Sequence, residues 1–599
     1  MKDRLRFSDL IPTGNEKRET LFVANAQTSN DWLCGVVLAL VVFVFPLTLG
    51  VPLLDPDEGL HAAIAREMVE GGNWWAPTLR GEPFLDKPIL YFWAQAFSLR
   101  LFGMNEAAVR LPGLMFGLLG AVTTGAIGWR MFGRATGVLA GCCYTTMLLP
   151  SALAQAAAHD VALVPAVNVA ILCCWELSRR GGTSLSMAGD CPNFRLSENG
   201  TVPLGVAYTL TLGLVLGLAC LTKGLAGVAV VGIAYASFLL IQWRLTLADC
   251  VRGVAALAVA ALVAGPWYVA MEHLNPGFLH YYFVVRHLKG FATDTQIHAN
   301  KPLWYYPLFL AAGGLPWIAY LPAALRCAWQ RRQGVCDFAK EPSFSGRAVL
   351  LLVCWLSGGL LFFSAAGSKL ATYIWPLFPP IAILAAAVWG ELLAGRLSAA
   401  PRRWLAVALW ATCLAGPVGA PAALAVSGVL CRIQYGWVEW LLAVAVGMAL
   451  WLPLVPWEIG QFRAVLPAAM LALAANFALV LALVLPRVAE RQSTRELAGY
   501  LHTLPHAPSH VVIIEKRVDA IGSLLFYLDS RLRDDLGKDR LQAMRLDQLP
   551  DCARLEPDAM VAVPESSGEE VGRYLKQPDA PGRRVGCYRI YTPGDFVPR

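Results

Sequence analysis

Residues 32–54 read WLCGVVLALVVFVFPLTLGVPLL, a run of 23 residues without one charged side chain. An α-helix needs about 20 apolar residues to cross about 30 Å of hydrocarbon, so this run predicts a membrane-spanning helix. The 31 residues before it are polar and show no small-residue cleavage pattern. This favours an uncleaved anchor over a signal peptide, and the sequence therefore predicts an integral membrane protein.

Charge-poor runs recur along the rest of the membrane portion, and the whole chain of 599 residues is 57% hydrophobic and 15% charged. An average soluble domain has about 25% charged residues. With the first run, thirteen spans are predicted; the others are 108–129, 135–153, 161–177, 203–221, 225–242, 253–271, 303–325, 348–364, 374–394, 404–428, 436–456 and 464–486. We therefore expect an all-α polytopic membrane protein of about thirteen transmembrane helices.

Lysine and arginine gather in alternate short loops, and such loops favour the cytoplasm. This bias predicts a cytoplasmic N-terminal tail, residues 1–31, and an extracytoplasmic C-terminus. The break at Thr222-Lys223-Gly224 leaves an alternative, in which residues 203–242 form one long helix with a buried lysine. That alternative would invert all later spans, and the basic loops at 326–347 and 396–403 argue against it.

The composition changes to that of a soluble domain after Pro486. Residues 510–514, 560–563 and 585–590 have strand character, and residues 494–501 and 568–576 have helix character. We predict a transmembrane domain over 32–486 and a small extracytoplasmic α/β domain over 487–599. The only cysteines in that domain are Cys552 and Cys587, for which both a disulfide and free thiols are open.

Two predicted extracytoplasmic loops, 55–107 and 272–302, are long, and long loops often carry function. In the first loop, Leu60, Ile64 and Met68 recur every four residues after Glu58, which predicts an amphipathic helix on the membrane surface. A second helix is predicted from Pro88. Asp57 leads the first helix and Lys87 the second. Asp57 could instead be a helix cap, and Lys87 could contact lipid phosphates.

Several cations fall on the predicted outer face, against the positive-inside bias: Lys87, Lys223, Arg286, Lys289 and Lys369. This placement indicates a phosphate ligand. Asp160 stands between two apolar runs, where a carboxylate is costly unless it has a partner or a task, although an N-cap is the alternative. The net charge of +7 is scattered, so no nucleic-acid partner is expected. No cysteine and histidine spacing resembles a metal site, and we expect no metal and no cofactor.

The membrane portion resembles a known family. The motifs are Asp55-Pro-Asp-Glu-Gly, Gly81-Glu-Pro-Phe-Leu-Asp-Lys-Pro, Leu221-Thr-Lys-Gly, Gly265-Pro-Trp-Tyr-Val and Gly367-Ser-Lys-Leu-Ala-Thr-Tyr. They are similar to motifs of bacterial lipid-linked-sugar glycosyltransferases, relatives of the dolichyl-phosphate-mannose-protein mannosyltransferases, and most like those of the 4-amino-4-deoxy-L-arabinose lipid A transferases. The resemblance implies a membrane glycosyltransferase fold of the GT-C type and an inverting transfer of a sugar from a polyprenyl-phosphate carrier.

The resemblance also implies roles for single residues. Asp57 and Asp160 would be the catalytic carboxylates, Lys87 would bind the donor phosphate, and further substrate-binding residues would be Asp55, Glu58, Lys223, Arg286, His287, Lys369 and Tyr373. The chain departs from the family at Leu60 and His61, where an arginine and a tyrosine are common. The missing arginine leaves the sugar open.

The implied partners are a polyprenyl-phosphate-linked sugar, lipid A or another extracytoplasmic acceptor, and the lipids of a bacterial inner membrane. No nucleotide is required, because the lipid carries the activated sugar. A protein O-glycosyltransferase with the same donor is an alternative. A transporter or flippase is another, but its charges would gather at the bilayer midplane rather than at one face.

Overall fold

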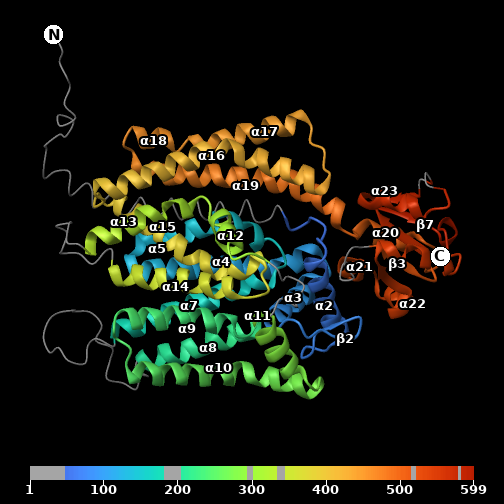
Figure 1. Ribbon diagram of the computed structural model, residues 1–599, viewed down its shortest axis with the longest axis horizontal. Helices are drawn as coiled ribbons and strands as arrows, with labels where there is room; N and C mark the ends of the chain where they lie inside the picture. Colours follow the sequence, from blue (N-terminus) through green and yellow to red (C-terminus); the bar gives the residue numbers. More distant parts are fainter. Residues whose placement is uncertain are drawn as a thin grey trace, which may run out of the picture.

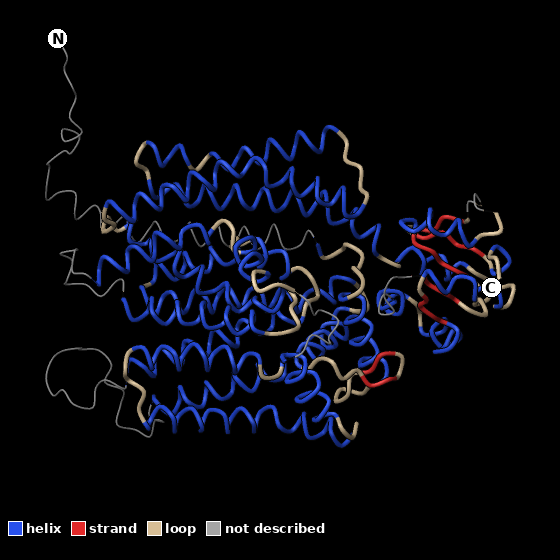
Figure 2. The backbone as a smooth tube through the Cα atoms, in the orientation of Figure 1, coloured by secondary structure: helices blue, strands red, loops and turns tan. Residues whose placement is uncertain are grey.

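The computed structural model describes residues 48–180, 204–292, 301–332, 345–514, 521–577, 580 and 582–598. These residues form a bundle of long helices and, at one end of it, a small domain with a sheet (Figures 1 and 2). In the described ranges, nine helices are long and apolar enough to cross a membrane, or eleven if each of two bent pairs is one span. The multi-pass architecture is thus confirmed, whereas the number thirteen is not. Residues 32–47 of the first predicted span lie outside the described residues.

The spanning helices follow the predicted runs closely. They are α4 (Glu106–Phe132), α5 (Arg134–Thr145) with α6 (Leu148–Ala154), η2 (His159–Ala162) with α7 (Leu163–Arg180), α8 (Leu204–Lys223), α10 (Leu247–Leu274), α12 (Tyr305–Gly313) with η4 (Trp317–Tyr320) and α13 (Leu321–Arg332), α14 (Gly346–Ala365), η5 (Ala371–Leu377) with α15 (Phe378–Leu393), α16 (Ala399–Cys431), α17 (Trp437–Met448) with η6 (Ala449–Trp451) and α18 (Leu454–Glu458), and α19 (Phe462–Gln492). The shorter apolar helix α9 (Ala226–Ile241) follows α8.

The chain breaks between α8 and α9, so the alternative of one long helix is wrong. α8 ends at Lys223, and Gly224 has a φ of 60°, a left-handed conformation that glycine adopts without a steric penalty. A Cβ at Gly224 would also overlap the ring of His287. The turn therefore places Lys223 at the end of a helix, beside the second long loop.

Helix α15 is the centre of the bundle. Its sequence is apolar on every side, and thirteen of its first fourteen residues pack away from solvent and lipid, as is typical of an interior helix. Helices α4, α5, α13 and α14 contact it. The outer helices α10, α16 and α17 expose many large apolar side chains, which suits contact with lipid. Helices α16, α17 and α19 form a separate layer along one side (Figure 1).

The first long loop contains two helices, α2 (Asp57–Gly71) and α3 (Leu90–Phe102), as the sequence predicts, although α3 begins two residues after Pro88. They lie between the bundle and the C-terminal domain (Figure 1). α2 is buried on most of its surface. The guanidinium of Arg66 donates to the backbone carbonyls of Phe526 and Leu528. The polar side of α2 thus faces the C-terminal domain, and the expected open membrane-surface helix is wrong in this respect.

The C-terminal domain is a five-stranded mixed sheet flanked by α20 (Arg495–Thr503), α21 (Gly522–Tyr527), α22 (Ser530–Arg540) and α23 (Gly568–Val571). The strands are β3 (Val511–Ile514), β4 (Leu541–Met544), β5 (Met560–Pro564), β6 (Arg583–Val585) and β7 (Tyr588–Tyr591), in the order β4-β3-β5-β7-β6. β3 is parallel to β4 and to β5, whereas β7 is antiparallel to β5 and β6. The predicted α/β class is confirmed.

Two details of this domain differ from the expectations. The predicted strand over 585–590 is a hairpin, because Gly586 at φ 58° turns the chain between β6 and β7. The disulfide between Cys552 and Cys587 that the sequence left open does not form. The two cysteines belong to the hydrophobic clusters on opposite faces of the sheet, and the sheet separates them.

Candidate active site

A cavity of about 400 Å³ lies where the first long loop, the turn after α8 and the second long loop meet. Its charged lining comes from Asp86, Lys87, Lys223, Arg286 and His287, with Tyr373 beside them. The rest of the wall is apolar and includes Leu225, Ala229, Phe291, Phe362 and Phe363. A basic end joined to an apolar wall suits a ligand with an anionic group and a hydrocarbon portion.

Asp160 forms an ion pair with Lys223, one of the residues that line this cavity. Asp160 lies in the short helix η2 at the start of α7 and is 6% exposed, and Lys223 ends α8. The Lys223 ammonium also lies 3.8 Å from the centroid of the Tyr373 ring, a cation–π contact. Asp160 therefore has a charged partner, which is what a carboxylate at membrane depth requires.

The second long loop supplies the opposite wall through the π-helix η3 (His280–Lys289). Its Arg286 guanidinium lies 3.3 Å from the Asp86 carboxylate, and the Tyr281 hydroxyl donates to Asp86 at 2.6 Å. Burial lowers the pKa of His287, whose Nδ1 lies 2.8 Å from the Tyr282 carbonyl. Asp86 thus holds Arg286 beside Lys87, the next residue along the chain.

Asp57 is exposed at the first position of α2, and it is not among the residues that line the cavity. His61, one turn later, is buried, and its ring centroid lies 4.1 Å from that of His159, the neighbour of Asp160. Burial lowers the pKa of His61 to about 4, against the opposing effect of the Asp57 charge. The two imidazoles therefore connect the segments that carry Asp57 and Asp160. Pro56 precedes the helix without a side-chain cap, so Asp57 is not the N-cap.

Three of the predicted substrate-binding residues have other partners. Glu58 is buried and pairs with Arg110 at 2.7 Å. Asp55 accepts hydrogen bonds from the backbone N–H and the hydroxyl of Ser523 in the C-terminal domain. Lys369 donates to the Lys301 carbonyl at 3.1 Å. The structure thus brings Lys87, Lys223, Arg286, His287 and Tyr373 into one cavity with Asp160 below, and places these three residues outside it.

Sequence reasoning missed several residues around the cavity. Arg110, which pairs with Glu58, did not stand out as a cation on the outer face, although an arginine near the start of a predicted span was a usable signal. No sequence pattern predicted that Phe291 and Phe362 line the cavity, because aromatic residues are common in every span. In the described ranges, no group of three or more histidine, cysteine or acidic side chains could hold a metal ion.

Comparison with solved structures shows the fold. The crystal structure of ArnT from Cupriavidus metallidurans bound to undecaprenyl phosphate matches 94% of this chain and 98% of its own, with a TM-score of 0.70 and 18% identity. The apo structure of the same protein matches with a TM-score of 0.67 and 20% identity. The chain is therefore a multi-pass membrane protein with the fold of ArnT, a helical bundle with an appended domain.

Comparison with curated proteins shows the family. The model of dolichyl-phosphate-mannose-protein mannosyltransferases matches residues 86–187. Proteins named undecaprenyl phosphate-α-4-amino-4-deoxy-L-arabinose arabinosyl transferase match from Erwinia tasmaniensis, at 34% identity over 57% of this chain and 56% of the relative, and from Enterobacter sp., at 31% over 65% and 64%. The relative from Pectobacterium carotovorum is 31% identical over 67% of this chain and 69% of its own length. The chain belongs to this family of arabinosyl transferases, and it spans 56% to 64% of the length of the first two relatives.

Proposed function

We propose that this protein transfers an amino-arabinose-type sugar from a polyprenyl-phosphate carrier to a phosphate of lipid A. The observation that carries the proposal is the cavity, where Lys87, Lys223 and Arg286 meet at one end of an apolar wall. A polyprenyl-phosphate carrier has an anionic phosphate, which the cations complement, and a hydrocarbon chain, which the apolar wall complements. The names of the relatives supply the sugar and the carrier.

The cations would act on the leaving group. An acceptor oxygen attacks the anomeric carbon, the bond from that carbon to the carrier phosphate breaks, and the phosphate leaves with the electron pair. Positive groups placed where this charge develops stabilise the transition state. Lys87 and Lys223 are suited to this role, and Asp86 would keep Arg286 within reach of the same phosphate.

The carboxylates would act on the sugar and the acceptor. Asp160 holds Lys223 in place by its ion pair and presents negative charge toward the anomeric carbon, which becomes positive in the transition state. An acceptor phosphate is already anionic, so it requires no general base. A hydroxyl acceptor would require one, and the exposed Asp57 could take its proton. With a phosphate acceptor, Asp57 would instead orient the reactants and stabilise the positive charge that develops on the sugar. A single displacement inverts the anomeric carbon.

We further propose that the protein lies in the bacterial inner membrane with its N-terminus in the cytoplasm and its C-terminal domain in the periplasm. The distribution of lysine and arginine over the short loops supports this orientation. Residues 86–88 of the first long loop line the cavity, and α2 of the same loop contacts α21 of the C-terminal domain, which supports a common side for both. The sugar would then be transferred outside the cytoplasm.

Mass spectrometry of lipid A tests the proposal in cells that lack the gene and carry it back on a plasmid. We expect the amino-arabinose adduct on lipid A phosphates with the unchanged protein, and no adduct with Asp57→Asn. This substitution is mild, because Asp57 is exposed. Asp534→Asn, the same change on the surface of α22, is the matched control and should retain the adduct.

Two results would contradict the proposal. Unmodified lipid A in cells that express the unchanged protein, together with a new glycan on surface proteins, would assign a peptide acceptor. A full level of adduct with Asp57→Asn, at equal expression, would remove Asp57 from the reaction.

A further inference from the structure

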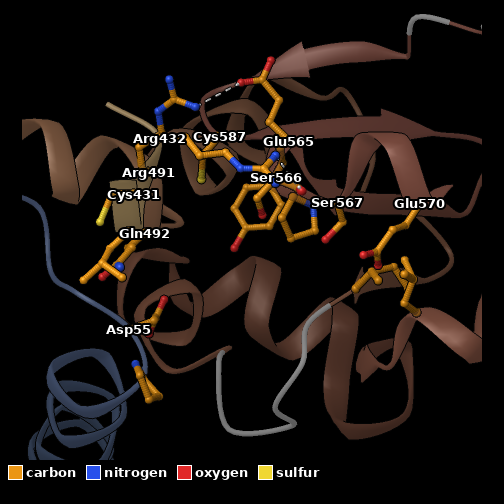
Figure 3. A pocket seen from close by; sticks show the side chains of 16 residues that line it. Asp55, Cys431, Arg432, Arg491, Gln492, Glu565, Ser566, Ser567, Glu570 and Cys587 are labelled. Carbon is orange, nitrogen blue, oxygen red and sulfur yellow. Dashed lines mark hydrogen bonds and ion pairs between the residues drawn. The ribbon is translucent and has the colours of Figure 1, made fainter. Parts of the chain in front are cut away.

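A second cavity, of about 480 Å³, lies between the C-terminal domain and the ends of two spanning helices (Figure 3). Arg432 follows the last residue of α16, Arg491 lies at the end of α19, and Asp55 closes the side toward the first loop. The facing wall is the segment Glu565, Ser566 and Ser567, which follows β5. This cavity shares no lining residue with the one that holds Lys87 and Lys223.

The cavity lies at the edge of the sheet where open α/β folds commonly bind ligands. β3, β4 and β5 are parallel, so their carboxyl ends meet at one edge. The cavity lining includes Ile514 and Pro564, the last residues of β3 and β5, and Leu546, which follows β4. In open α/β sheets, ligands bind in the crevice outside these strand ends.

Arg432 is the residue that points to a ligand. Its backbone has φ 53° and ψ 36°, the left-handed conformation, which is strained for a residue with a Cβ. Its guanidinium donates to the Ser566 carbonyl at 3.3 Å, and none of the described carboxylates lies within ion-pair distance of it. A cation held in a strained conformation at a cavity wall indicates a bound anion.

The acidic residues of the lining do not neutralise all of the arginines on the same wall. Glu565 is the nearest carboxylate, and it lies 3.2 to 3.9 Å from three guanidiniums, those of Arg491, Arg584 and Arg589. Of the other two acidic residues in the lining, Asp55 accepts from Ser523, and Glu570 is exposed on α23, at the far side in Figure 3. The arginines and the serine hydroxyls together form a donor set for phosphate oxygens.

We propose that this interdomain cavity binds the phosphate of an anionic lipid head group. α16 and α19 are long and apolar enough to cross a membrane, and the ends of such helices lie near the head groups of a bilayer, which is where we place Arg432 and Arg491. A free phosphate ion would bind to the same donors, but its site would not need to lie at the ends of spanning helices. The site is separate from the sugar-transfer cavity, and the inference does not depend on transfer.

Native mass spectrometry of the detergent-purified full chain tests the proposal with phosphatidic acid, which carries a phosphate monoester, and phosphatidylcholine for comparison. We expect two bound phosphatidic acid molecules with the unchanged protein, one with Arg432→Gly or Lys87→Gln, and none with both changes. Binding at the interdomain site should weaken about tenfold or more with Arg491→Gln. Glycine accepts the left-handed backbone, so Arg432→Gly should unfold at the same temperature as the unchanged protein or a higher one.

Several results would overturn the proposal. One is equal binding by the unchanged protein and Arg432→Gly, and another is equal affinity for phosphatidylcholine. Displacement of the second lipid by an equal concentration of inorganic phosphate would assign a free phosphate ion instead. A lipid lost only with Lys87→Gln would support the transfer cavity and refute this one, so the two failures are distinguishable.

Discussion

The buried pair of Glu58 and Arg110 should stabilise the first loop rather than bind substrate. The Glu58 carboxylate accepts from Arg110 Nε at 3.0 Å and Nη2 at 2.7 Å, and from the backbone N–H groups of Leu54 and Ala157, both at 2.9 Å. Its side chain is 6% exposed and that of Arg110 is 1% exposed. One carboxylate thus joins three segments of the chain.

The expected cost of Glu58→Gln follows from this geometry. The substitution keeps the volume but leaves a buried guanidinium without a counter-charge, and the loss of one partner of a buried pair costs about 3–5 kcal/mol. Glu58→Leu with Arg110→Met should be no less stable than Glu58→Leu alone, because no charge is then left buried. The Arg110 hydrogen bonds to Thr48 and Pro52 carbonyls would still be lost.

Unfolding of the purified protein in mixed detergent micelles measures these changes. Glu439→Gln is the control, because the Glu439–Arg487 pair has similar geometry at 2.5 Å but is partly exposed, so its loss should lower the stability far less than Glu58→Gln does. If Glu58→Gln were as stable as the unchanged protein and yet failed to bind the donor, the structural role of Glu58 would be refuted and a substrate contact restored.

Two further predictions concern α2. Burial lowers the pKa of His61 from 6.5 in the unfolded chain to about 4, so the stability contributed by neutral His61 is complete above pH 6.5 and falls by about 3 kcal/mol toward pH 4. His61→Gln should therefore lose less thermal stability over that pH range than the unchanged protein. The same pH slope in both proteins would contradict this prediction. A methyl group at Gly522 would overlap the backbone of Leu60, so Gly522→Ala should displace α2 and raise the KM for the donor. Gly416→Ala, which is crowded against the Leu450 side chain in the outer helices, should lower stability without changing that KM. Equal KM values for both variants would refute the inference that the contact of α21 with α2 positions α2 for donor binding.

The sequence predicted the helices of the first loop but not their surroundings. The spacing of Leu60, Ile64 and Met68 depends only on helical geometry, so it was readable. The contact of Arg66 with Phe526 and Leu528 joins residues about 460 positions apart, and no local pattern records such a pairing. The tertiary contact therefore buried a face of α2 that the pattern assigned to the membrane surface.

The cavity was predicted only in part for a similar reason. Lys87 and Lys223 stood out because cations on the outer face break the positive-inside bias, and the structure places both in one lining. Lys369 is also a cation on the outer face and Glu58 is an acidic residue of the first loop, but in the fold Lys369 donates to the Lys301 carbonyl and Glu58 pairs with Arg110. Charge alone does not tell a ligand-binding side chain from one that holds the chain together, because that depends on which partner the fold brings near.

The rate of sugar transfer by the purified, reconstituted protein tests the role of the basic cavity most directly. The measurement follows transfer from undecaprenyl-phosphate-linked 4-amino-4-deoxy-L-arabinose to lipid A, with Lys87→Gln compared with Lys576→Gln, the same change at a lysine of the C-terminal domain. The loss of a group that stabilises the leaving phosphate should lower kcat/KM about a hundredfold or more, and Lys576→Gln should leave it unchanged. If Lys87→Gln retained kcat/KM within about twofold, the donor phosphate would not be bound in this cavity.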